Sequence, residues 1–489
     1  MPLPSRDLSA AVATTAADAT TASVRVRSGA TTEALRERAL DVLLDPALAH
    51  VAALVCWSEK GLVHVADSRG HVALDAGGAV SLLAGRDPLA DQDPFSDRTT
   101  AFPFAAMRLR SLFDDPRAPD LAVVHTGAHH WPDRGGHLGE HGSLNGVQSR
   151  APLVLSGPGV SERGIVDAVA RTVDVGATLA RLTGGDESGM EGRALELVQP
   201  GAPHVVGLLW DGAQCADLLA DARAGRLPNV SRLLERGCAL RGGAIAEFPS
   251  VTLVNHTCAL TGVGPGRHGI VNNAYYDREL GEQVVPNESG SWHKAMQWLR
   301  PGVRTVFERL PEGATSACVN DPVDTGAGYS TFALIRESSG AGGPSLGELL
   351  PPADDDLHVT REHFNDHGDY RWSTQVDAAG LEQVLGLWRE GPPPRLTWWN
   401  STLTDTGHHT GGPRSAVARA SMADTDRRLG VWLDLVEERG LLDDVVVLLT
   451  ADHGSEGADP ACTGDWDAAL EAAGVPFRDE AYGFVYLGD

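Results

Sequence analysis

Short apolar runs alternate with amphipathic stretches along most of this 489-residue chain. Apolar runs bounded by Gly, Pro and polar residues are typical of buried strands, and their alternation with helical patterns indicates a parallel α/β sheet. We expect strands at residues 23–27, 121–124, 152–156, 205–210, 396–399, 445–449 and 482–487. We expect helices at residues 32–44, 165–182, 230–235, 415–438 and 466–472. The sequence therefore predicts an α/β fold with a mostly parallel central sheet and helices on both faces.

Polar side chains follow two of the expected strands directly. Asp211 comes after 205–210, and the adjacent pair Asp452 and His453 comes shortly after 445–449. Because the carboxyl ends of parallel strands meet at one edge of a sheet, these side chains are expected to lie there together. Helix capping is the simpler explanation of Asp211 taken alone. The Asp-His pair is the stronger indication of a metal site, since carboxylate and imidazole are common zinc ligands.

Two further segments place polar residues near helix starts. Thr252 begins an expected helix, where backbone N–H groups can hold an anion, and Asn255 lies one turn on, where it can donate to the same anion. Taken alone, Thr252 is a capping residue. Asp405 and His409 follow another strand with i, i+4 spacing, which puts both on one side of a turn, as in many metal sites. His408 is the alternative ligand.

The order of these residues resembles the type I phosphodiesterase/nucleotide pyrophosphatase family of the alkaline phosphatase superfamily. The family's nucleophile segment, P-T-x-T-F-P-N-H, is similar to PSVTLVNH at 249–256, and T-G and H-G-I follow in both. The family's D-x-x-G-H-x-x-G-P is similar to 405–413, with His408 where Gly is usual. The resemblance covers most of 204–489 except 272–395, and it implies an alkaline-phosphatase-like fold with an inserted cap.

The resemblance also implies a function, a metal-dependent phosphodiesterase or nucleotide pyrophosphatase with Thr252 as nucleophile and Asn255 stabilising the phosphoryl group. The expected cofactor is a pair of divalent ions, Zn²⁺ in the first place with Mn²⁺ or iron as alternatives. One ion is expected on Asp211, Thr252, Asp452 and His453. The other is expected on Asp405, His409 and a third histidine.

That third histidine normally follows the Asp-His pair, but no histidine follows His453 in this sequence. Residues 120–160 resemble the missing segment and place His141 on the third-histidine position, with His137 as its rival. We therefore predict a circular permutation. The alternative is a separate N-terminal domain whose histidines are incidental.

The permutation divides the chain into five parts. Residues 1–22 form a disordered tail, and 23–183 form the permuted C-terminal half of the catalytic core. Residues 184–203, rich in Gly, Glu and Pro, form a linker. The N-terminal half of the core consists of 204–271 and 396–489, and 272–395 forms a cap or insertion. Permutation of this kind is tolerated when chain termini lie close together at the surface.

The charge and composition of the chain argue against some classes of binding partner. Lys and Arg number 40 and Asp and Glu 66, a formal net charge of -26, which argues against binding to nucleic-acid polymers or anionic membranes. No run of about 18 apolar residues is present, so no membrane helix is expected. The N-terminal stretch lacks a basic start followed by an apolar core, which predicts a cytoplasmic protein. The six cysteines contain no CxxC pair and are expected as buried thiols.

The expected substrate is a small phosphodiester or nucleotide-like molecule. The alternatives are a phosphonate hydrolase or phosphomutase on the same core, or a non-catalytic metal-binding relative. An alternative assembly is a homodimer in which His141 completes the site of a neighbouring chain.

Overall fold

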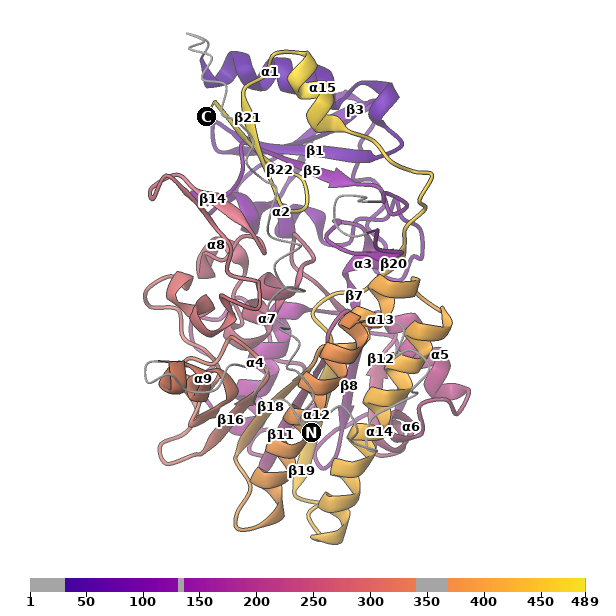
Figure 1. The fold of residues 1–489 in the computed structure, drawn as a ribbon, viewed down its shortest axis with the longest axis vertical. Helices are drawn as coiled ribbons and strands as arrows, with labels where there is room; N and C mark the ends of the chain where they lie inside the picture. The colour runs from indigo at the N-terminus through magenta and orange to yellow at the C-terminus, as the bar shows by residue number, and fades with distance from the viewer. Residues whose placement is uncertain (1–30, 131–135, 340–367, 489) are drawn as a thin grey trace, which may run out of the picture.

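The computed structural model describes residues 31–130, 136–339 and 368–488, and contains two large sheets that lie one above the other in Figure 1. The lower sheet has eight strands in the order β17 (Tyr329–Ser330), β16 (Ser316–Val319), β18 (Leu396–Ser401), β11 (His204–Trp210), β19 (Val445–Thr450), β8 (Leu153–Ser156), β12 (Gly237–Leu240) and β9 (Gly164–Val166). Neighbours from β17 to β19 are parallel, whereas β8 is antiparallel to both of its neighbours. The prediction of an α/β fold with a mostly parallel central sheet is confirmed.

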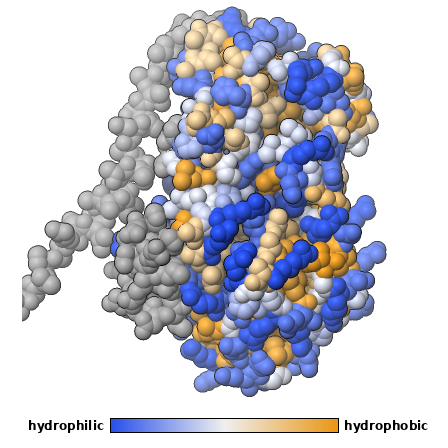
Figure 2. Space-filling view, turned by 90° about the vertical axis from the view of Figure 1, so that its right-hand side faces the viewer, coloured by the Kyte–Doolittle hydropathy of each residue, from blue (hydrophilic) through white to orange (hydrophobic). Residues whose placement is uncertain are grey.

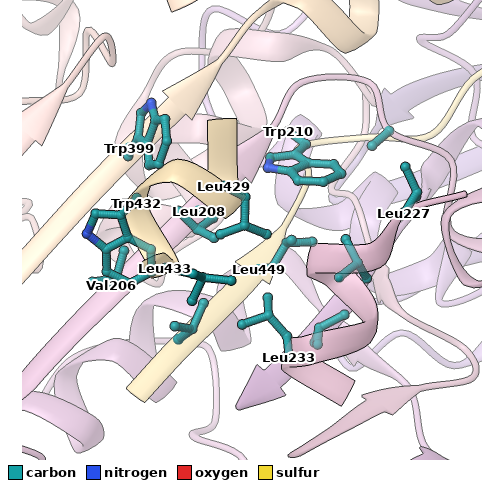
Figure 3. Close-up of a cluster of buried hydrophobic side chains, with 14 of the residues drawn as sticks. Val206, Leu208, Trp210, Leu227, Leu233, Trp399, Leu429, Trp432, Leu433 and Leu449 are labelled. Atoms are coloured by element: carbon teal, nitrogen blue, oxygen red, sulfur yellow. The ribbon is translucent and has the colours of Figure 1, made fainter. Parts of the chain in front are cut away.

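Helices cover both faces of this sheet, because the central strand β11 is apolar on both sides. Val206, Leu208 and Trp210 pack with α5 (Cys215–Arg223), α6 (Pro228–Glu235), α12 (Gly368–Arg389) and α14 (Ala416–Glu438), and Figure 3 shows part of this cluster. Val205 and Leu209 pack on the other face with α4 (Thr172–Thr183) and α7 (Thr252–Thr261). Each such buried side chain contributes about 1.5–3 kcal/mol.

The upper sheet is antiparallel throughout and combines segments from both ends of the chain. Its order is β21 (Phe477–Glu480), β22 (Phe484–Leu487), β5 (Leu121–His125), β1 (Ala52–Glu59), β2 (Leu62–Asp67), β3 (Gly70–Leu74) and β4 (Val80–Gly85). The helices α1 (Thr32–Leu43) and α15 (Trp466–Ala472) pack on one face, and α2 (Ala105–Phe113) packs on the other. Pairing of β22 with β5 joins the C-terminal segment to the N-terminal half.

One expected helix differs from the structure, and two expected segments lie outside the described residues. The helix expected at 165–182 begins only at Thr172, because the preceding residues pair as β9 and β10 (Ala170–Arg171), and the amide of Arg171 donates to the Asp174 carboxylate, 2.8 Å away, at the helix start. The tail 1–22 and the strand expected at 23–27 lie outside the described residues.

The expected linker, 184–203, packs along the surface of the core. Its Val198 forms a bridge with Val160, and the amides of Glu191 and Gly192 both donate to the carbonyl of Gly262. The expected cap or insertion, 272–395, supplies β16 and β17 to the edge of the central sheet. Short edge strands with few apolar residues carry little periodicity, so the sequence did not separate them from an insertion.

The surface is mixed in character. Figure 2 shows hydrophilic side chains over most of one face, interspersed with smaller hydrophobic patches. All six cysteines are unpaired and five are buried, as expected. None of the helices within the described ranges has the length and hydropathy of a membrane span.

Candidate metal centre

The topology of the central sheet places the candidate ligands at one edge. Strands β18, β11 and β19 are adjacent and parallel, so Asp405, Asp211 and Asp452 all follow carboxyl ends at that edge. Strand β8 runs in the opposite direction, with Leu153 beside Thr450. The residues that precede β8 therefore reach the same edge as the residues that follow β19. An antiparallel pairing of β6 (Gly139–Glu140) with β20 (Glu456–Gly457) joins these two segments.

Asp211, Asp405 and His453 form one compact group, and His141, Asp405 and His409 form a second that shares Asp405. Within each group the candidate ligand atoms lie within 4.8 Å of one another. His409 Nε2 lies 3.2 Å from Asp405 Oδ2, and His453 Nε2 lies 3.1 Å from Asp452 Oδ2.

All three histidines are oriented in the same way by the backbone. The Nδ1–H of His141 donates to the carbonyl of Ser250 at 3.1 Å, that of His409 to Gly139 at 2.8 Å, and that of His453 to Gly454 at 2.9 Å. A carbonyl can only accept, so each neutral ring keeps the lone pair of Nε2 for another partner. This is the arrangement of histidines that bind metals in proteins.

His141 lies between the other two histidines. Its ring stacks on that of His453 with centroids 3.7 Å apart, and its centroid lies 5.1 Å from that of His409. The structure thus brings His141, from the first half of the chain, together with the residues of the second half. The rival His137 also lies beside His409, with ring centroids 4.1 Å apart, and its Nδ1 lies 3.6 Å from Glu140, but these residues form a separate candidate group that does not include Asp405.

The charges of the site favour a cation. Burial raises the pKa of Asp211 well above its ordinary value, and the neighbouring Asp452 and Asp405 raise it further. Burial also opposes ionisation of Asp405, but the adjacent His409 outweighs it and lowers the pKa of that carboxyl. Within the described residues, Asp211 Oδ1, Asp452 Oδ2 and His453 Nε2 are buried without a well-oriented hydrogen bond. Crowded carboxylates and unsatisfied ligand atoms are what divalent ions bind.

Thr252 is the first residue of α7, and its neighbours on both sides contact the ligand segments. Two residues before it, Ser250 accepts from the His141 ring and its hydroxyl accepts from the Gly142 amide at 3.2 Å. One turn after it, His256 Nε2 lies 3.6 Å from Asp452 and 3.9 Å from Asp211. Thr252 itself is half-buried at the start of the helix.

The prediction that Asn255 donates to a bound anion is wrong. Asn255 is fully buried, its Oδ1 accepts from the amide of Glu247 at 2.7 Å, and its Nδ2 donates to the carbonyls of Glu247, Pro249 and Val251. One turn into the helix, the side chain points back into the loop and holds the segment that carries Thr252.

Two residues near the site were not identified from the sequence. Asn273 Oδ1 accepts from the Leu253 amide at 3.1 Å, which places the asparagine amide beside the start of α7. His256 forms a buried ion pair with Asp321 at 2.9 Å while its Nε2 faces the carboxylates. The signal for His256 was its place in the resembling motif, whereas Asn273 stands in a loop with no pattern of its own. His408, the alternative to His409, is buried and belongs to neither ligand group.

Comparisons with known proteins found a family model and several relatives. A model of the family described as type I phosphodiesterase/nucleotide pyrophosphatase matches residues 205–482. The chain is 24% identical over 233 residues to a venom phosphodiesterase of Naja atra, a match that covers 47% of this chain and 24% of the relative. It is 37% identical over 230 residues to an uncharacterized pyrophosphatase/phosphodiesterase of Schizosaccharomyces pombe, which covers 47% of this chain and 41% of that relative.

Among solved structures, murine ectonucleotide pyrophosphatase/phosphodiesterase 5 is 18% identical with a TM-score of 0.38, and the match covers 57% of this chain and 64% of that one. A phosphonoacetate hydrolase from Sinorhizobium meliloti is 24% identical with a TM-score of 0.36, covering 54% and 59%. The chain spans about a quarter of the length of the venom relatives that it matches.

Proposed function

Because this chain belongs to the type I phosphodiesterase/nucleotide pyrophosphatase family of the alkaline phosphatase superfamily, we propose that it is a metal-dependent hydrolase of small phosphodiesters or nucleotide-like molecules. The observation that supports this most strongly is the set of three backbone-anchored histidines whose Nε2 atoms are left for ligands beside three aspartates, of which Asp211 and Asp452 are buried.

The residues fit a pair of divalent ions. Asp211, Thr252, Asp452 and His453 would hold one ion, and the other would be held by Asp405, His409 and His141. When bound, such ions lower the pKa of a hydroxyl group and stabilise the charge of a phosphoryl group in an in-line displacement. Mixed carboxylate and imidazole ligands suit zinc, with manganese or iron as alternatives.

The protein's own residues then perform the transfer in two steps. Thr252 Oγ loses its proton to solvent and forms a bond to phosphorus, while the bond from phosphorus to the leaving alcohol breaks and solvent protonates that alcohol. Water hydrolyses the threonyl ester and restores the hydroxyl group. The amide of Asn273 would donate to a phosphoryl oxygen, while Asn255 keeps the loop before Thr252 in place.

The proposal includes the circular permutation. It is supported by the family match, which begins at residue 205, and by the first half of the chain, which supplies His141 and the central strand β8. Pairing of β22 with β5, and the packing of α1 on α15, further support a single catalytic core made from both halves.

The test replaces the nucleophile. We expect Thr252→Ala to lower turnover of bis(p-nitrophenyl) phosphate by roughly 10³-fold or more, because no other group can form the ester. Metal analysis of the same variant should still find the aspartate and histidine ligands loaded. Thr252→Ser, which keeps a hydroxyl group, is the matched control and should retain measurable turnover.

Full activity in Thr252→Ala would rule out Thr252 as the nucleophile. Wild-type turnover of phosphonoacetate far above that of the diester would favour the phosphonate hydrolase alternative. Less than one ion per chain in wild-type protein after zinc supplementation would favour the non-catalytic relative.

A further inference from the structure

A tyrosine from the C-terminal segment reaches the centre of the candidate site. The hydroxyl group of Tyr482 lies 3.5 Å from Nε2 of His141, and the two rings have centroids 5.3 Å apart. Because the Nδ1–H of His141 donates to Ser250, the Nε2 atom is the acceptor and the phenol is the donor in this contact. The Tyr482 hydroxyl group is therefore directed at the same nitrogen that would hold an ion.

The backbone of Tyr482 is held in a conformation that tyrosine rarely adopts. Its φ is +56°, in the left-handed region, where side chains other than glycine are disfavoured. The turn is fixed on both sides, because Asn272 donates to the carbonyl of Ala481 and the Gly483 carbonyl accepts from Val123 at 2.8 Å. Such outliers cluster at functional sites, where surrounding contacts maintain them.

The neighbouring residues make room for this ring. A Cβ atom on Gly142, next to His141, would lie 2.4 Å from Cδ1 of Tyr482, so only glycine permits the close approach. Tyr482 also packs against a small apolar cluster that includes Val251 and Val254, on either side of Thr252 in the sequence. Tyr482 thus lies between the start of α7 and the histidine ligand.

We propose that Tyr482 is a substrate-contacting residue, whose hydroxyl group donates a hydrogen bond to a non-bridging phosphoryl oxygen. The inference rests on the proposed function. Once Nε2 of His141 gives its lone pair to an ion, it no longer accepts the phenol proton. A phosphoryl oxygen bound beside His141 can accept that proton, and a donor at this position stabilises the charge on the oxygen.

The experiment compares Tyr482→Phe with wild-type protein, both loaded with zinc. Inorganic phosphate is the probe, its dissociation constant is measured by isothermal titration calorimetry, and zinc content is measured by mass spectrometry. We expect equal zinc content and phosphate binding weaker by roughly 10- to 100-fold, since a hydrogen bond to a charged acceptor is lost. For bis(p-nitrophenyl) phosphate, kcat/KM should fall by a similar factor.

Tyr486→Phe is the matched control. Its hydroxyl group donates to the carbonyl of Arg117 at 2.9 Å in the same terminal segment, away from the ligands, so phosphate affinity should not change. Unchanged phosphate affinity in Tyr482→Phe would overturn the proposal, and so would loss of zinc, which would make the residue a support for His141 only. Tyr482-dependent phosphate binding without any diester turnover in wild-type protein would instead reject the proposed function and leave the contact intact.

Discussion

At the scale of single residues, the orientation of a histidine ring says more about whether it can bind a metal ion than the presence of the histidine does. The sequence contains 18 histidines, and only their partners in space distinguish ligands from the rest. His141, His409 and His453 each donate Nδ1–H to a backbone carbonyl, which leaves Nε2 toward the aspartates. His125 shows the contrast, because its Nδ1 contacts the Thr126 carbonyl and its Nε2 the His141 carbonyl, and burial lowers its pKa to about 4.

We predict that His141→Ala and His137→Ala separate the two rivals for the third-histidine position. His141→Ala should reduce bound zinc by about one ion per chain, because the group with Asp405 and His409 loses a ligand. His137→Ala should leave zinc content unchanged, since His137 groups with Glu140 and His409 but not with Asp405. Mass spectrometry of metal content after gel filtration is the measurement. The reverse result would transfer the ligand role to His137.

The residue-level expectations from the sequence depended on where each side chain sits relative to a strand. Asp211, Asp452 and His453 follow buried strands, so their positions were set by the sheet and could be anticipated. The direction of the Asn255 side chain was predicted wrongly, because it is set by hydrogen bonds to the loop before Thr252. Spacing along the helix does not reveal those bonds. Asn273 could not be anticipated, since its place beside Leu253 is set by tertiary packing.

At the scale of elements, the sheet edge that carries the ligands depends on close packing of β11 against β18. Gly207 lies opposite Trp398 in the register, and a Cβ atom at Gly207 would lie 2.3 Å from Cε3 of the indole. Trp398 is fully buried, and its Nε1 donates to Asp321 at 2.7 Å, so the ring has no room to move away. The same Asp321 pairs with His256 beside the metal ligands.

We predict that Gly207→Ala destabilises the protein by about 1–3 kcal/mol through overpacking. The matched control is Gly386→Ala in the exposed part of α12, where a Cβ atom would meet nothing within 4 Å. That change should stabilise the protein by about 0.5–1 kcal/mol, because alanine favours helix over glycine. Urea unfolding gives both values. A neutral Gly207→Ala would show that the indole can shift without cost.

The core strands could be predicted from the sequence, and so could β5 and β22 of the second sheet, expected at 121–124 and 482–487, whereas β1 to β4 could not. The strands expected at 205–210, 396–399 and 445–449 agree with β11, β18 and β19 to within two residues, because both faces of each are apolar. Strands β1 to β4 form hairpins with His, Ser and Ala among their residues, and β4 is exposed along its length. A half-buried edge strand has little hydrophobic pattern, so periodicity does not reveal it.

At the scale of the whole molecule, the two ends of the described chain meet. A Cβ atom at Gly488 would lie 3.8 Å from Cδ1 of Leu35, and α1 packs with α15 and β22 in one cluster. In Figure 1 the C-terminus lies beside α1. The order of segments is therefore not dictated by the packing, and either half can precede the other in the chain.

We predict that a reordered chain folds to the same structure. Residues 31–199 would follow residue 488 through a short Gly/Ser linker, and the chain would open between Gln199 and Pro200, which are both exposed. The rearranged protein should keep the zinc content of the original and most of its thermal stability, because every packed contact is retained. Circular dichroism and metal analysis test this. A reordered chain that remains unfolded would mean that the halves depend on their present order.

The pairing of distant segments also determines when during biosynthesis the catalytic centre can exist. The contact between His409 and Gly139 joins positions 270 residues apart, and that between Tyr482 and His141 joins positions 341 apart. During translation, His141 is therefore synthesised long before Asp405 and His409, the residues of its ligand group. Closing such long loops is slow, and the early segment remains exposed to chaperones and to stray cations until translation ends. A growing chain that has not reached His453 therefore lacks the complete set of candidate ligands.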